Sequence, residues 1–150
     1  MRRVEVVGNL NLFGVDPPNT GAGYASGGFM ANCKVSGSIN AGSQQQFFSR
    51  NNDMTTWENG AWNFVFLGCP NAPAENCGNT SALPVTKVDE TPLIAEKPFI
   101  SLENGRYYLN VPGHELNKVG TNWTGEVPLA NKFDFSNVYV ANERDSADTI

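Results

Sequence analysis

Hydrophobic and polar residues alternate along residues 29–35, which predicts a strand with one buried face. The hydrophobic members of this alternation are Phe29, Ala31, Cys33 and Val35. Two glycines, Gly37 and Gly42, interrupt the pattern, and glycine is a frequent turn residue. A second extended segment follows at residues 43–48. The pattern therefore predicts a strand, a sharp corner and a second strand, with Cys33 as a small core residue.

The second segment contains three consecutive glutamines, residues 44–46. Side-chain amides can form hydrogen-bonded ladders along stacked strands. The amide row therefore predicts one coil of a parallel β-solenoid. Because neighbouring residues of a strand point to opposite faces, Gln44 and Gln46 share a face that could contact a sugar. Gln45 points the other way, so at least one face has a structural role.

Four further segments have the pattern of strands or extended chain: residues 4–15, 61–68, 84–97 and 133–141. Residues 61–68, AWNFVFLG, are apolar at both alternating positions, which predicts a strand buried on both faces with Trp62 in the core. The loops between them, including residues 51–59, are polar. The composition agrees with a turn-rich all-β protein, since the 150 residues include 15 Gly, 9 Pro and only 17% charged residues.

A β-hairpin is predicted at residues 99–111, where strand-forming segments flank Asn104 and Gly105. Asn-Gly favours the type I′ turn because both central residues of that turn need a positive φ.

Near the C-terminal end of the sequence, Asp145 and Ser146 are typical of a helix N-cap. A chain that begins in a strand pattern and ends at a cap is expected to be a piece of a longer polypeptide. The alternative is a small complete domain with a frayed terminus.

Charge and hydropathy exclude some partners. The net charge is −5 and no basic patch is interleaved with aromatic residues, which argues against nucleic acid. No apolar run approaches the ~18 residues of a membrane span. The cysteine and histidine spacing does not resemble a zinc site, and no nucleotide or cofactor motif is present. We therefore expect no metal and no cofactor.

Cysteines and glycosylation motifs help to predict whether the protein is secreted. Cys69 and Cys77 are eight positions apart around a proline-containing loop, so a local disulfide and two free thiols both remain open. Asn79 and Asn122 each begin an Asn-X-Ser/Thr motif for glycosylation. Both motifs point weakly towards a secreted or extracellular protein.

The linear series GGFMANCKVSGSINAGSQQQFFSRN, AWNFVFLG, TPLIAEKPFI and VANERDSADTI resembles large secreted bacterial and fungal right-handed β-helix proteins. These proteins resemble the pectate-lyase superfamily and the two-barrel β-1,3-glucanases. The resemblance implies terminal coils of one β-helix over residues 1–83. It implies an inter-barrel connector with the hairpin over residues 84–128, and the first strand and helix cap of a second β-helix over residues 129–150. It also implies a polysaccharide ligand.

Glycoside hydrolysis usually needs two carboxyl groups. Asp53 and Glu58 lie in the segment after the glutamines, and Glu96 lies in the EKPF part of the resembling series. These three are the candidate catalytic residues. The alternatives are a turn residue for Asp53, a solvated carboxylate for Glu58 and an ion pair for Glu96.

Four residues are candidate substrate contacts: Gln44, Gln46, Arg50 and Trp57. The arginine could clamp a carboxylate or equally hold a corner carbonyl. The tryptophan could stack on a sugar face. The sequence thus predicts part of a secreted, polysaccharide-active β-helix protein, with a glycoside hydrolase favoured over a lyase. The alternatives are a non-catalytic structural or carbohydrate-binding solenoid and a connector without a site. The expected protein partner is the remainder of a longer polypeptide or a second chain.

Overall fold

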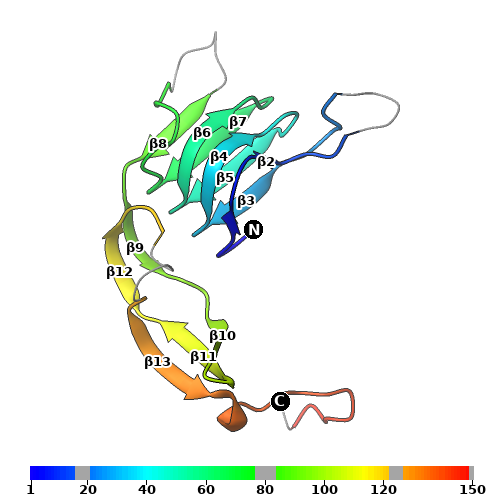
Figure 1. Cartoon of the computed structure of the whole chain (residues 1–150), viewed down its shortest axis with the longest axis vertical. Helices are drawn as coiled ribbons and strands as arrows, with labels where there is room; N and C mark the ends of the chain where they lie inside the picture. The colour runs from blue at the N-terminus through cyan, green and yellow to red at the C-terminus, as the bar shows by residue number, and fades with distance from the viewer. Residues whose placement is uncertain (16–20, 77–83, 122–126, 149–150) are drawn as a thin grey trace. The chain divides into compact units, whose positions relative to one another are not determined.

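A computed structural model describes residues 1–15, 21–76, 84–121 and 127–148 (Figure 1). The described residues form thirteen strands and one short 3-10 helix, so the predicted all-β class is confirmed. The chain divides into two compact units. The first, here the parallel unit, comprises Met1–Ile94 and Leu116–Glu126, and the second, here the hairpin unit, comprises Ala95–Glu115 and Val127–Ile150. The predicted division into three segments stays a prediction.

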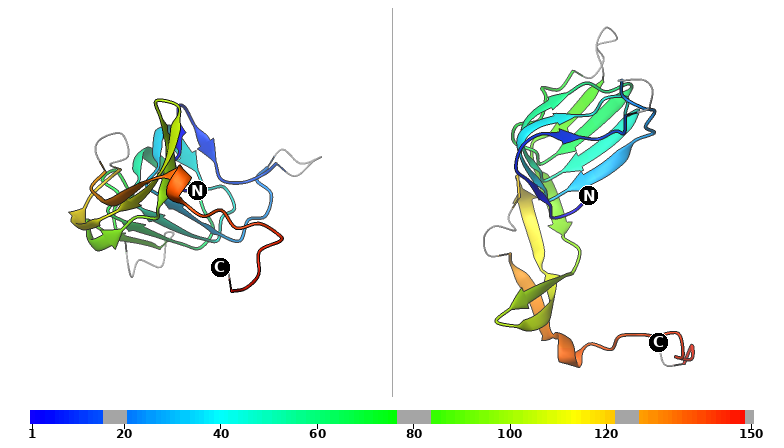
Figure 2. Two further views of the ribbon diagram at one scale, coloured as in Figure 1. Left: turned by 90° about the horizontal axis from the view of Figure 1, so that it is seen from below. Right: turned by 45° about the vertical axis from the view of Figure 1, so that its right-hand side comes forward.

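The parallel unit contains a first sheet of four strands whose neighbours are all parallel. In spatial order these strands are β3 (Gly28–Ala31), β5 (Gln46–Arg50), β7 (Asn63–Leu67) and β8 (Val85–Val88). They lie side by side in the right-hand view of Figure 2. Here the register joins Phe29 to Phe48 and Phe48 to Val65. Residues that pair across neighbouring strands are therefore far apart in the sequence.

A second sheet of the same unit is centred on β4 (Lys34–Asn40). Its other strands are β1 (Glu5–Val6), β2 (Leu10–Asn11) and β6 (Asp53–Glu58), each parallel to β4. From β3 to β7 the chain alternates between the two sheets. Met30 pairs with Ser49 and Val35 pairs with Met54, each 19 positions later. Both sheets therefore pair residues at the same separation along the chain.

The hydrophobic core lies in the parallel unit. Side chains on alternate positions of both sheets fill it, including Met30, Val35, Ile39, Phe47, Met54, Phe64 and Phe66. Cys33 is also fully buried here, which confirms its prediction as a core residue. Strand β7 is buried only at Phe64 and Phe66, while Asn63 and Val65 are exposed. The prediction of a strand buried on both faces is therefore wrong.

The corner between the two sheets lies at Asn32, five residues before the predicted position. Asn32, Asn51 and Gly68 stand at this corner in successive turns, with φ of 53°, 50° and 62°. Each donates its backbone N–H to the next turn: to Arg50 O, Leu67 O and Val88 O at 3.1, 2.8 and 2.9 Å. Asparagine and glycine are the residues that tolerate this left-handed conformation best. The corner interrupts the continuous strand predicted over residues 29–35.

Three asparagines at the corner, Asn32, Asn51 and Asn52, are fully buried. Asn52 accepts from the Cys33 N–H at 2.8 Å and donates to Met30 O at 2.9 Å. Asn51 donates to Lys118 O and accepts from Thr91 Oγ1, both at 2.9 Å. Residues 51–59, predicted as a polar loop, therefore comprise a buried corner followed by β6. No regular glutamine ladder occurs over residues 44–46, because only Gln46 belongs to a strand.

The hairpin unit contains a three-stranded antiparallel sheet in the order β10-β11-β13. Its strands are β10 (Phe99–Glu103), β11 (Arg106–Pro112) and β13 (Leu129–Asp134). Asn104 and Gly105 connect the first two with φ of 50° and 79°, which confirms the predicted hairpin. Strand β13 ends at Asp134, which caps the 3-10 helix η1 (Phe135–Asn137). The strand predicted over residues 133–141 is therefore displaced towards the N-terminus.

Two further strands form a separate two-stranded sheet: β9 (Thr91–Ala95) and β12 (His114–Lys118). Strand β9 bears out the extended chain predicted over residues 84–97. Residues 147–148 form a turn, and residues 145–148 contain no helix. There the Asp145 carboxylate accepts the Asn142 N–H at 2.6 Å. No described helix is long and apolar enough to cross a membrane.

Candidate carbohydrate-binding face

The outward-facing side of β3, β5 and β7, here the outer face, carries amide and aromatic side chains side by side. Gln46 pairs with Asn63, and both side chains are exposed. Two positions along, Phe48 lies between Phe29 and Val65 in the register. Phe48 is 36% exposed. The parallel register therefore places an amide row next to an apolar row on one open surface.

A shallow hollow of about 450 Å³ lies on the outer face. It is lined by Ser26, Gly27, Gly28, Gln46, Phe47, Phe48, Asn63 and Val65. Amides donate and accept hydrogen bonds, and an aromatic ring offers an apolar surface of fixed shape. None of the lining residues carries an ionisable side chain. The chemistry of this lining suits a neutral polar ligand, and it includes no carboxyl, imidazole or amine that could act as a general acid or base.

Two glycines shape one wall of the hollow. A Cβ atom on Gly27 would lie 2.2 Å from the Gln46 backbone oxygen, and Gly27 also has a φ of +136°. A Cβ atom on Gly28 would lie 2.7 Å from the Phe47 ring. Larger residues would push β3 away from β5 at this point. The glycines thus permit the close approach that places β3 beside Gln46.

Aromatic contacts fix the apolar row. The Phe29 and Phe48 rings pack at a centroid distance of 5.4 Å. The Arg2 guanidinium lies 4.6 Å from the centre of the Phe29 ring, a cation–π distance. Trp62, directly before β7, is 55% exposed, although the sequence predicted it in the core. The outer face therefore has a fixed aromatic pair, Phe29 and Phe48.

The structure does not bring Asp53 and Glu58 together. They are the two ends of β6, and five steps of about 3.3 Å separate their Cα atoms by roughly 16 Å. Carboxyl pairs of glycosidases are at most about 9.5 Å apart. Two carboxylates placed in this way do not flank a single glycosidic bond.

Asp53 has a local structural contact. Its Oδ2 accepts a hydrogen bond from Thr121 Oγ1 at 2.8 Å, and its Oδ1 accepts the Thr121 N–H at 3.4 Å. Glu58 is exposed at the end of its strand. Glu96 is buried and belongs to the hairpin unit. Catalytic roles for the three carboxylates remain predictions.

The predicted substrate contacts lie in different environments. Gln46 lines the hollow, whereas Gln44 is buried and donates from its amide to Leu12 O. Trp57 packs against the rings of Phe47, Phe64 and Phe66 at 5.3, 5.6 and 5.1 Å. It is therefore a core residue and not an open platform for sugar. Arg50 ends β5 and is half-buried.

Cys69 is a free, fully buried thiol, which favours the second of the two alternatives that the sequence left open. Its sulfur accepts the Asn52 N–H at 3.4 Å and points to Leu67 O at 3.6 Å. Burial raises the pKa of this thiol to about 11, so it is unreactive at neutral pH. Its predicted partner Cys77 and the glycosylation candidates Asn79 and Asn122 lie outside the described residues.

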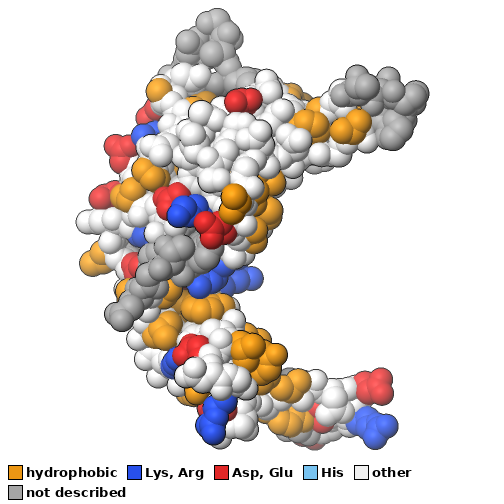
Figure 3. Space-filling view, in the orientation of Figure 1, with side chains coloured by type: hydrophobic (Ala, Val, Ile, Leu, Met, Phe, Trp, Pro, Cys, Tyr) orange, Lys and Arg blue, Asp and Glu red, His pale blue; other side chains and the backbone are white. Residues whose placement is uncertain are grey.

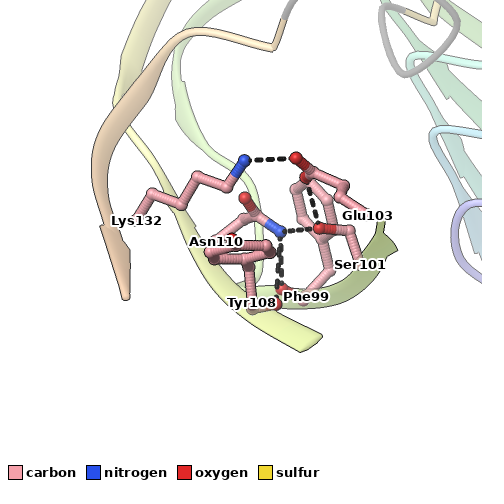
Figure 4. A network of polar contacts seen from close by, with 6 residues as sticks. All are labelled: Phe99, Ser101, Glu103, Tyr108, Asn110 and Lys132. Atoms are coloured by element: carbon pink, nitrogen blue, oxygen red, sulfur yellow. Dashed lines mark hydrogen bonds and ion pairs between the residues drawn. The ribbon is translucent and has the colours of Figure 1, made fainter. Parts of the chain in front are cut away.

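A polar network covers one face of the hairpin unit (Figure 4). Lys132 Nζ contacts Glu103 Oε2 at 2.6 Å, and Ser101 Oγ donates to Glu103 Oε1 at 2.8 Å. Asn110 Nδ2 donates to Ser101 Oγ at 2.8 Å, and Lys132 lies 4.4 Å above the Tyr108 ring. Hydrogen bonds from Lys132 and Ser101 lower the pKa of Glu103. The network connects all three strands, which is a structural role.

No group of three or more potential metal ligands occurs among the described residues.

Two members of the outer face, Phe48 and Asn63, were not identified as candidates from the sequence. Their signal is the parallel register, which places Phe48 beside Val65 and Asn63 beside Gln46. A local pattern does not contain that register, because the paired residues are 17 positions apart.

Comparisons with known proteins found similar bacterial proteins. The chain matches no family model. It is 36% identical over 149 residues to an exo-beta-1,3-glucanase from Streptomyces sp. (strain SirexAA-E / ActE), covering 99% of this chain and 23% of that protein. Two solved structures of sacteLam55A from Streptomyces sp. SirexAA-E are also similar.

One of these structures has a TM-score of 0.76 and 36% identity over 89% of this chain and 23% of the other. The second, a variant in complex with glucose, has a TM-score of 0.86 and 35% identity over 99% of this chain and 26% of the other. The chain thus spans about a quarter of the length of these relatives. The chain is therefore homologous to one part of an exo-β-1,3-glucanase, the part that it matches.

Proposed function

We propose that this chain is part of a secreted glycoside hydrolase that acts on β-1,3-glucan. The observation that carries this proposal is the 36% identity over 149 residues to an exo-beta-1,3-glucanase. The glucose complex of a similar structure gives further support for a sugar ligand. The secreted location rests on the family resemblance and the two sequence motifs at Asn79 and Asn122.

The finer fold assignment in this proposal is a right-handed parallel β-helix in the parallel unit. The parallel pairings of β3 with β5 and of β4 with β6 support it, since both join residues about 19 positions apart. The corner at Asn32, Asn51 and Gly68 supports it too, because it repeats once in each turn. Stacked coils of this kind present a long, regular outer surface.

Within the whole protein, the outer face of β3, β5 and β7 would hold glucan. The Gln46 and Asn63 amides would hydrogen-bond sugar hydroxyl groups, while the Phe48 ring would contact the apolar C–H side of a glucose ring. The hollow is lined by no carboxyl group. The acid and base of hydrolysis would therefore come from outside it, and these residues would position substrate.

The test is hydrolysis of a soluble β-1,3-glucan by the natural polypeptide that contains these residues. Asn63→Ala removes one amide and should raise KM roughly 2- to 10-fold, since a hydrogen bond contributes about 0.5–1.5 kcal/mol. Because the lost contact exists before and during reaction, kcat should change little. The matched control is Thr56→Ala, which alters an exposed side chain of the other sheet.

Two results would count against this proposal. Absence of β-1,3-glucan hydrolysis with retained glucan binding favours the second candidate, a non-catalytic carbohydrate-binding module, which the uncharged lining of the hollow also fits. Equal KM values for the native protein, Asn63→Ala and Thr56→Ala would contradict substrate binding by the outer face. They would leave the hydrolase assignment intact.

A further inference from the structure

The β10-β11-β13 sheet has one polar and one apolar face. Antiparallel register places Ile100, Leu109 and Phe133 in one row, and Leu102 and Tyr107 in the next. Residues directly opposite each other in a sheet share a face, so these five side chains form one surface, here the apolar face. The opposite face carries the Glu103–Lys132 network.

The apolar face is open in this chain. Ile100 is 56% exposed, Leu102 60%, Tyr107 56% and Phe133 45%. Figure 3 shows hydrophobic side chains at the surface in the region where Figure 1 places these strands. A sheet normally buries its apolar side against another layer, and contiguous exposed apolar patches mark interaction sites. The five side chains include no charged group, so a complementary surface is also apolar.

We propose that the apolar face packs against the remainder of a longer polypeptide of which this chain is a part. The length of the relatives supports this occupant. The chain matches one relative over 99% of its own length but only 23% of that protein, so about three quarters of the homologous polypeptide lies outside it. This inference rests on the proposed function only in assuming that longer protein.

Cysteine labelling tests this contact. Leu102→Cys places a thiol on the apolar face, and Val140→Cys is the matched control because Val140 is 63% exposed in the same unit but outside the sheet. Labelling by a maleimide is followed for each peptide by mass spectrometry, so the native cysteines stay in place. In the 150-residue chain, both engineered thiols should react at similar rates.

In the polypeptide translated from the intact reading frame, the Leu102→Cys thiol should react at least tenfold more slowly than the Val140→Cys thiol. Equal rates there overturn the proposal, and they do so without touching the proposed function if that polypeptide still hydrolyses β-1,3-glucan. Protection of Leu102→Cys in the 150-residue chain that grows with concentration also overturns it, because a second copy is then the occupant. A reading frame that encodes only these 150 residues overturns it as well.

Discussion

The parallel unit and the hairpin unit reach β structure by different routes. In the parallel unit, paired residues such as Val35 and Met54 are 19 positions apart, and the hydrophobic core cluster lies within this unit. In the hairpin unit, Leu102 pairs with Tyr107 only five positions later, and both side chains are exposed. Non-local pairing is thus stabilised by shared burial, while local pairing depends on the turn and on surface contacts.

The largest difference between the units should appear when one aromatic residue is truncated in each. Trp57→Ala removes a ring that contacts three core phenylalanines, and should lower the free energy of unfolding by about 3 kcal/mol. Tyr107→Ala removes a side chain that is 56% exposed and should cost under about 1 kcal/mol. Denaturant titration followed by circular dichroism measures both. Equal losses would contradict the assignment of the core to the parallel unit.

A pair of glycine substitutions separates close packing from backbone conformation. Gly68 and Gly105 both have positive φ, 62° and 79°. A Cβ atom on Gly68 would lie 2.6 Å from Lys118 O, whereas one on Gly105 has no neighbour within 4 Å. Gly105→Ala should therefore cost about 1–2 kcal/mol from conformation alone.

Gly68→Ala should lose about 1–3 kcal/mol more than Gly105→Ala, because overpacking is added to the same conformational cost. Thermal and denaturant unfolding compare the two variants. If Gly105→Ala proved the more damaging of the pair, the stacked corner would not be the tightly packed part of this chain.

A smaller effect is expected from the polar network of the hairpin unit. The pKa of Glu103 is lowered by its hydrogen bonds with Lys132 and Ser101. Its folded value lies below its ordinary value of 4.5, so its stabilising contribution is present above that pH and is lost as the pH falls through the folded value.

Glu103→Gln should therefore lower the melting temperature slightly at pH 7 and leave it unchanged at a pH well below 4. The control is Glu90→Gln, at another exposed carboxylate, which should leave the melting temperature unchanged at both pH values. A destabilisation by Glu103→Gln that persisted in strong acid would show that the ion pair and its hydrogen bonds are not its cause.

Local signals in the sequence predicted local structure well. Asn104 and Gly105 identified the hairpin, because their need for positive φ is a property of those two residues. Cys33 was correctly placed in the core. The prediction of one continuous strand over residues 29–35 was wrong, because Asn32 forms a left-handed corner there. The alternation of hydrophobic and polar residues continues through this corner and therefore does not reveal it.

The site was less predictable, because it depends on which strands become neighbours. Trp57 was predicted to contact sugar and Trp62 to lie in the core, but the structure shows Trp57 packed against the core and Trp62 exposed. The predictions followed the polarity of the sequence, since residues 51–59 had the polarity of a loop and residues 61–68 that of a buried strand. Their actual environments follow from the register of β6 and β7 in two different sheets. Gln46 was identified from the sequence, but its neighbour Asn63 belongs to a strand that only the fold places beside it.

The central claim is that the outer face of β3, β5 and β7 binds β-1,3-glucan. Isothermal titration of a soluble β-1,3-glucan into this chain measures it most directly, with the double variant Phe48→Ala/Asn63→Ala and the control Thr56→Ala. We predict that the double variant binds about tenfold or more weakly, because it loses an aromatic contact and a hydrogen bond, and that the control binds like the native chain. Equal affinity of all three proteins, or no binding by the native chain, would contradict the claim.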